Sequence, residues 1–137
     1  MKILKIISFS VLLMATLASP AIGANNTVIL ADIPAKTIVI KHPEAADVTK
    51  YFANATVINF EIYKVGSATD LEKIIKSISG DANVQSFVAG RVTGDFSAVT
   101  LILKSAKGKI WFANLVKNAG LAHIKINNNV AVEADKL

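Results

Sequence analysis

Apolar and polar residues alternate along Val57–Val65, which is the two-residue period of a strand with one buried face. One side of this strand carries three large apolar residues, Ile58, Phe60 and Ile62. The opposite side carries Asn59, Glu61 and Tyr63. We therefore expect the first side to pack inside the protein and the second side to meet solvent, a partner or another part of the chain.

The next segment has the period of a helix. The apolar residues that share one face of this helix are Leu71, Ile74, Ile75 and Ile78. Two alternative capping boxes precede them, Ser67–Asp70 and Thr69–Glu72, because each places a hydroxyl three positions before an acidic residue. The pattern predicts a helix that starts near Thr69 and ends at Gly80.

Two runs rich in β-branched and aromatic residues follow, Val84–Arg91 and Ala98–Lys104. A turn signal at Thr93–Asp95 separates them, so the runs predict a β-hairpin. A second helical pattern comes next and stops at Gly120. Its apolar face is formed by Phe112, Leu115, Val116 and Ala119. Leu121–Ile126 alternates again and predicts the last strand.

The order of elements from Val57 to Ile126 is thus strand, helix, strand, strand, helix, strand. Each helix has one apolar face and each strand one apolar side. Burial of all these surfaces favours two helices on one face of a four-stranded antiparallel sheet. The predicted fold class is α+β, a ferredoxin-like βαββαβ sandwich, and we assign the domain to residues 57–137.

Residues 25–56 predict an extension of this domain. Thr27–Leu30 and Lys36–Ile40 are β-branched runs separated by a proline-bearing connection, and a short helix is expected after Pro43. The two strands either extend the sheet at an edge or pair with each other over one of its ends. At the far end of the chain, Val130–Val132 predicts a short edge strand.

Residues 1–24 have the features of a secretory signal peptide. Two lysines precede the apolar stretch Ile6–Leu17, and small residues lead to a cleavage site expected near Gly23 or Ala24. The apolar stretch is shorter than the ~20 residues of a membrane-spanning helix, and no later segment approaches that length. We expect a bacterial protein that is exported to the periplasm or secreted.

The chain contains no cysteine, which excludes disulfides, thiolate metal sites and a cysteine nucleophile. In element order and spacing it nevertheless resembles the heavy-metal-associated domain family. The segments that carry the resemblance are Val65–Glu72, Gly80–Ser86 and Leu115–Leu121. In that family the loop after the first strand holds copper(I) or zinc through two cysteines, and the matching loop here has neither. The resemblance implies the family's fold and the loss of its soft-metal chemistry.

Three oxygen-bearing side chains remain in or beside that loop, Thr69, Asp70 and Glu72. They are weak candidates for binding a hard ion, because calcium takes six or more oxygen ligands. The interpretation that we favour is that they cap and solubilise the N-terminus of the helix, where negative charge is stabilising. No cofactor is predicted.

No arrangement of residues typical of catalysis occurs in the chain. The two histidines, His42 and His123, are far apart in sequence, and neither has a serine or aspartate partner at motif spacing. We therefore do not expect an enzyme.

A run without acidic residues separates Asp95 from Glu133 and predicts one positive end of the molecule. Its lysines are Lys104, Lys107, Lys109, Lys117 and Lys125. Without Lys2 and Lys5 of the signal, however, the chain keeps 13 basic and 10 acidic residues, a charge of +3 rather than +5. This modest charge is typical of a solvated surface, and export argues against binding to nucleic acid.

The strongest functional candidate is the sheet face opposite the helices. The residues expected to line it are Asn59, Glu61, Tyr63, His123 and Lys125. This face either contacts a partner or is covered by the N-terminal strands, and an antiparallel sheet permits both. The main hypothesis is a non-catalytic binding protein that contacts another protein, or a second copy, through this face or an edge strand. The alternative is a metal-binding or metal-delivery protein that uses oxygen and histidine ligands.

Overall fold

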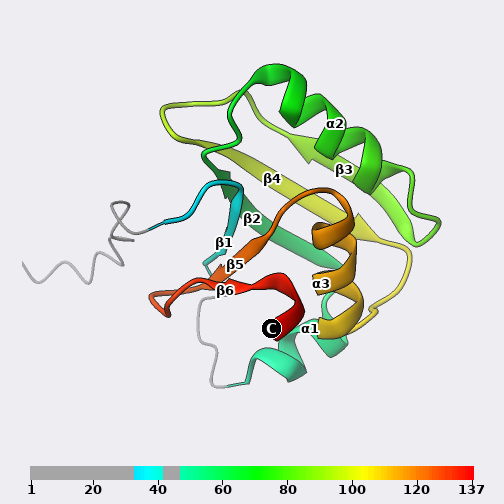
Figure 1. The fold of residues 1–137 in the computed structure, drawn as a ribbon. Coiled ribbons are helices and arrows are strands. Elements are labelled where there is room, and N and C mark those ends of the chain that lie inside the picture. Colours follow the sequence, from blue (N-terminus) through cyan, green and yellow to red (C-terminus); the bar gives the residue numbers. More distant parts are fainter. Residues whose placement is uncertain (1–32, 42–46) are drawn as a thin grey trace, which may run out of the picture.

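The computed structural model describes residues 33–41 and 47–137. Over these residues the chain forms three α-helices packed on a six-stranded mixed sheet (Figure 1). The helices are α1 (Val48–Asn54), α2 (Ala68–Ser79) and α3 (Lys109–Asn118). The strands are β1 (Thr37–Ile40), β2 (Val57–Tyr63), β3 (Val84–Ala89), β4 (Phe96–Leu103), β5 (His123–Ile126) and β6 (Val132–Glu133). A short 3₁₀ helix over Ala134–Lys136 ends the chain.

The strands lie in the order β3-β4-β2-β1-β5-β6. The hairpin predicted for Val84–Lys104 is present as the antiparallel pair β3 and β4. β2 pairs with β4 along its whole length, from Val57 opposite Ile102 to Tyr63 opposite Phe96. β1 and β5 are parallel, whereas every other neighbouring pair is antiparallel.

The predicted sheet of four antiparallel strands is wrong in its centre, because β1 lies between β2 and β5. The register places Ile38 opposite Ile62 of β2 on one side and opposite Ile124 of β5 on the other. All four residues of β1 are buried, so the strand needs neighbours on both edges and cover on both faces. Neither placement expected for Lys36–Ile40, at an edge or over one end, is the one observed. The companion strand expected at Thr27–Leu30 lies outside the described residues.

α2 begins one residue before the predicted start, and of the two alternative capping boxes the structure uses the one that starts at Ser67. The backbone N–H of Asp70 donates to Ser67 Oγ over 3.1 Å, and Ser67 Oγ donates to Asp70 Oδ2 over 3.0 Å. This reciprocal contact satisfies one of the N–H groups that the first turn leaves without an intrahelical partner.

The main core lies between the helices and one face of the sheet. Phe112 of α3 is fully buried at its centre, with ring centroids 4.9 Å from Phe52 of α1 and 5.9 Å from Phe60 of β2. This aromatic cluster joins α1, which closes the lower end of the molecule in Figure 1, to the sheet.

The C-terminal residues extend the sheet at the β5 edge. β6 pairs with β5, and the edge strand expected at Val130–Val132 is present two residues later. Asp135 accepts from Lys117 of α3 over 3.1 Å, and this ion pair lowers the pKa of the Asp135 carboxyl. In the part of the chain that is described, no helix has the length and apolar character needed to cross a membrane.

Candidate interaction surface

The strand register places the five predicted surface residues on one face of the sheet, opposite the helices. Thr37 of β1 stands opposite both Tyr63 and His123. Its neighbour two residues on, Val39, stands opposite both Glu61 and Lys125. The residues from β2 and those from β5 therefore share a face as expected, but β1 separates them.

One end of this face is covered. Tyr63 is only 4% exposed, and its ring stacks on Phe96 with centroids 5.3 Å apart. Ile33 and Val39 complete this second apolar cluster, and Lys64 Nζ donates to the Ile33 carbonyl over 2.6 Å. Tyr63 was expected to line a partner surface, but its ring belongs to a small core built by the segment before β1.

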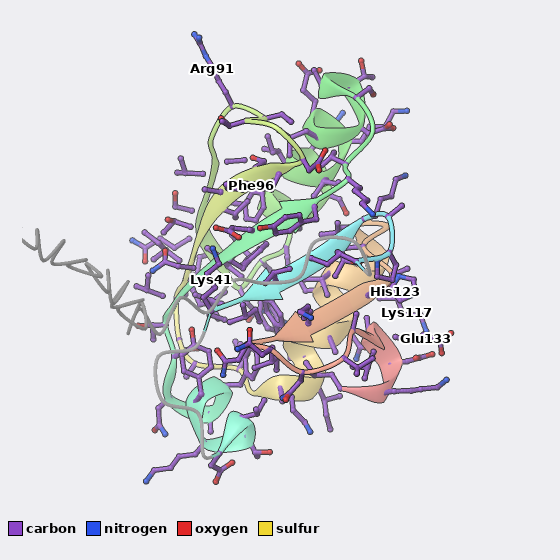
Figure 2. The ribbon with its side chains drawn as sticks, turned by 90° about the vertical axis from the view of Figure 1, so that its left-hand side faces the viewer. Lys41, Arg91, Phe96, Lys117, His123 and Glu133 are labelled. Carbon is purple, nitrogen blue, oxygen red and sulfur yellow. The ribbon has the colours of Figure 1, made fainter. Side chains whose placement is uncertain are left out.

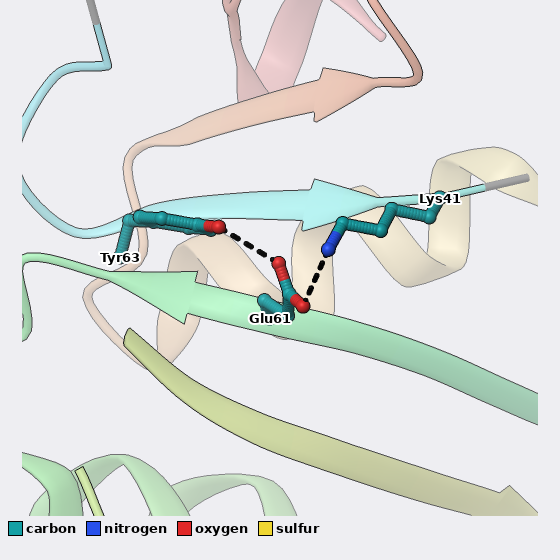
Figure 3. A network of polar contacts seen from close by, with 3 residues as sticks. All are labelled: Lys41, Glu61 and Tyr63. Atoms are coloured by element: carbon teal, nitrogen blue, oxygen red, sulfur yellow. Dashed lines mark hydrogen bonds and ion pairs between the residues drawn. The ribbon is translucent and has the colours of Figure 1, made fainter. Parts of the chain in front are cut away.

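A polar network borders the covered end (Figure 3). Lys41 Nζ lies 2.7 Å from Oε1 of Glu61, and the Tyr63 hydroxyl donates to Oε2 of the same carboxylate over 2.9 Å. Burial, together with the hydrogen bond and the negative charge of Glu61, raises the pKa of Tyr63 to about 12. Both oxygens of Glu61 are therefore engaged within the chain.

A shallow depression of about 330 Å³ adjoins this polar network on the same face, and Lys41 and Glu61 are among its lining residues. It extends over β1, β2, β4 and the end of β3. Its lining includes Val39, Lys41, Asn59, Val88, Ala98 and Thr100. Thr100 donates to Asn59 Oδ1 over 2.9 Å, which fixes that amide at the border of the depression.

A second depression, of about 510 Å³, lies at the opposite side of the sheet, where the loop before α2 meets the end of β3. Its walls are mostly apolar, and Glu72 and Arg91 are its charged residues. The apolar side chains include Val65, Leu71, Ile75, Ala89 and Val92. Figure 2 shows Arg91 projecting away from the hairpin that forms one wall.

The three weak ion ligands lie along the first turns of α2. Thr69 is exposed, Asp70 holds the cap with Ser67, and Glu72 borders the second depression. Within residues 33–41 and 47–137 no three histidine, aspartate or glutamate side chains come together as a metal site would require. Ser67 is the capping residue, and the Asp70 carboxylate supports the cap by accepting from the Ser67 hydroxyl at the helix N-terminus, where negative charge is favourable.

His123 lies at the β5–β6 end of the sheet, beside Lys117 and Glu133 (Figure 2). It stands opposite Glu133 in the β5–β6 pair. Its Nδ1 atom is buried and has no hydrogen-bond partner among the described residues. The other histidine, His42, lies outside those residues.

The lysines after Asp95, which were expected to make one end of the molecule positive, differ in their contacts. Lys117 pairs with Asp135, as described above. Lys104 Nζ donates to the carbonyl of Ala82 over 2.7 Å, across the end of the β3–β4 hairpin. At least two of the five are therefore engaged in contacts within the chain.

The sequence hypothesis named an edge strand without saying which one, and in the described sheet β3 is an edge strand. Among the described residues no strand pairs with its outer edge, which ends the sheet. The strand Val84-Gln-Ser-Phe-Val-Ala89 carries neither charge nor proline, the features that usually protect an edge from pairing. Val88 is 60% exposed on the open face. The absence of lysine and proline from this run was the signal in the sequence.

No protein-family model matches the chain, and the comparisons with curated proteins and with solved structures found no significant match.

Proposed function

We propose that this protein is an exported, non-catalytic interaction domain that binds a polypeptide by strand addition along β3. The observation that carries the proposal is the uncharged outer edge of β3, which pairs with no other strand among residues 33–41 and 47–137, with a depression on each face of the sheet at its end. In strand addition, backbone hydrogen bonds provide affinity and alternate side chains enter pockets on the two sides.

The two depressions suit such a ligand. Val88 and Gly90 border the depression on the open face, whereas Ala89 and Gly90 border the one beside α2. A strand added next to β3 directs successive side chains to opposite faces. Neighbouring residues of the added strand would therefore reach toward one depression and then the other.

The architecture fits a modified ferredoxin-like unit of the kind found in heavy-metal-associated domains. β2, β4 and β3 keep the order expected for that fold. β5 runs opposite to β2, because it is parallel to β1 and β1 is antiparallel to β2. In this proposal β1 is a strand inserted between the first and last strands of the unit. Because the chain has no cysteine, the role proposed for the domain is contact with another polypeptide and not transfer of a soft metal ion. The basic and apolar N-terminal residues support export.

Site-specific photo-crosslinking in cells tests the proposal. Val88 is replaced by p-benzoylphenylalanine, and Ile110, which is 75% exposed on α3, is replaced in a matched control. We expect a discrete polypeptide adduct at position 88 only. The adduct should disappear when Ala89→Pro is added, since proline removes a backbone donor from the strand. Equal labelling at both positions would contradict the proposal.

A further inference from the structure

We infer that the polypeptide bound along β3 is β3 of a second copy, paired antiparallel about a two-fold axis at Val88. The inference rests on the proposed function, because it names the partner of the same edge. It follows from the direction of the backbone groups of β3, from the side chains along the strand and from the charges on α2.

The direction of the backbone groups follows from the pairing of β3 with β4. Gly90 donates its N–H to the carbonyl of Ala98 over 2.8 Å, and the β3–β4 register continues with Ala89 opposite Val99 and Val88 opposite Thr100. Hydrogen-bonded pairs alternate along an antiparallel ladder, so Val88 bonds to β4 like Gly90. The N–H and C=O groups of Phe87 and Ala89 therefore point away from β4.

The outward N–H and C=O groups of β3 in one copy can pair with the same groups of β3 in a second copy. In an antiparallel pair centred on Val88, Phe87 of each copy faces Ala89 of the other. Each such pair exchanges N–H···O bonds, so both outward-facing residues of the flat part of β3 find partners. The irregular register between Val84 and Ser86 leaves Ser86–Ala89 as this flat part.

The side chains also favour a second copy. The two Val88 residues would meet at the axis as a pair without hydrogen bonds, where side chains come closest. This contact would cover an apolar side chain that is 60% exposed. Because β3 carries no charge, self-pairing brings no like charges together along the strand.

An acidic and a basic residue on α2 also suit a two-fold pairing of β3. Glu72 borders the depression beside β3, and Lys76 follows one turn later on the same face of the helix. A two-fold axis reverses the direction of the partner helix. Glu72 of one copy therefore lies toward Lys76 of the other, and the two charges attract.

The other edge of the sheet is unsuited to the same contact. β6 has only two residues, and Glu133 in it forms an ion pair with Lys136 over 2.6 Å. A short, charged strand resists pairing. Pairing through β3 alone would close after two copies and would not build a fibre.

The cysteine-free chain allows a direct test by disulfide formation. Residues opposite each other in a pair without hydrogen bonds have Cα atoms about 4.5 Å apart, within the range of a disulfide. Val88→Cys should therefore form a covalent dimer under mild oxidation. Ile110→Cys on α3 is the matched control, since Ile110 is at least as exposed as Val88. We expect the Val88→Cys dimer to form roughly tenfold faster or more, because the two thiols share a high effective concentration.

Light scattering of the purified wild-type protein should give twice the mass of one chain, and Ala89→Pro should give the mass of a single chain. Equal oxidation rates for Val88→Cys and Ile110→Cys, with single-chain mass for the wild type, would overturn the inference. If position 88 then still crosslinks in cells to a polypeptide of different mass, strand addition stands and only the second copy is wrong. If position 88 also fails to crosslink, the proposed function fails with it.

Discussion

The hydroxyl of Tyr63 donates a 2.9 Å hydrogen bond to Oε2 of Glu61, two residues earlier on the same face of β2. The other oxygen of Glu61 contacts Lys41, which follows β1 (Figure 3). The Tyr63 ring itself is buried against Phe96. A phenol and a carboxylate thus lie side by side on β2, and ionisation of the phenol would place two negative charges next to each other.

The first prediction concerns stability at high pH. The pKa of Tyr63 is about 12 in the folded protein and about 10 in the unfolded chain. The folded state therefore holds the proton more tightly, and the associated stability is complete below pH 10 and lost as the pH rises toward 12. Urea unfolding at stepped pH should show a free energy of unfolding that falls more steeply in this window for the wild type than for Tyr63→Phe.

Near pH 8, Tyr63→Phe should also cost about 1–3 kcal/mol, because it removes a hydrogen bond to a charged group. Tyr51, whose pKa is also raised by burial, is present in both proteins and does not affect the comparison. If the free energy of unfolding fell equally steeply above pH 10 in the wild type and in Tyr63→Phe, Tyr63 would have the same pKa in the folded and unfolded chains, contrary to the prediction.

The second prediction concerns the cap of α2. Ser67→Ala removes the acceptor for the Asp70 N–H and should lower the free energy of unfolding by about 1 kcal/mol. The control is Ser79→Ala at the other end of the same helix, where the serine is exposed and alanine has the higher helix propensity. Thermal unfolding should give a lower midpoint temperature for Ser67→Ala than for Ser79→Ala. If Ser79→Ala lowered the midpoint as much as Ser67→Ala, the result would contradict a stabilising role of the cap.

The parts of the fold that could be predicted are those whose residues carry a one-sided apolar pattern. The buried residues of α2 lie on one side, and those of β2 do so except for Tyr63, so their periods of 3.6 and two residues were sufficient. The position of β1 could not be predicted, because periodicity reports which face of a strand is buried and not which strands lie beside it. Four consecutive buried residues in Thr37–Ile40 are typical of a strand in the middle of a sheet.

The candidate surface was predicted in part. The shared face of Asn59 and Lys125 followed from alternation, but the burial of Tyr63 depends on Ile33 and Phe96, which are distant in sequence. An edge strand was part of the hypothesis, but β3 could not be singled out because the sequence of a strand does not state which of its two edges is paired. Only the pairing with β4 reveals that the uncharged run Val84–Ala89 is the last strand of the sheet in the part of the chain that the structure describes.

The third prediction tests the interior position of β1. Its amides bond alternately to β2 and β5, so all of them should exchange with deuterium slowly, close to the rate set by global unfolding. Strand β6, which is exposed and short, should exchange much faster and provides the internal comparison. If β1 were an edge strand, every second amide would exchange fast, and NMR would detect that alternation.

The fourth prediction tests which backbone groups of β3 face outward. Ala89→Pro removes an N–H that points away from β4, a position where edge strands accept proline, and should cost less than about 1 kcal/mol. Val88→Pro removes an N–H that bonds to β4 and leaves a carbonyl without its donor, so it should cost about 2–3 kcal/mol. The fluorescence of Trp111, the single tryptophan, follows unfolding in both variants. Dilute protein should be used, because pairing between copies then contributes little to apparent stability. If Ala89→Pro lowered the free energy of unfolding more than Val88→Pro, the N–H of Ala89 and not that of Val88 would face β4. The register proposed for pairing with a second copy would then be wrong.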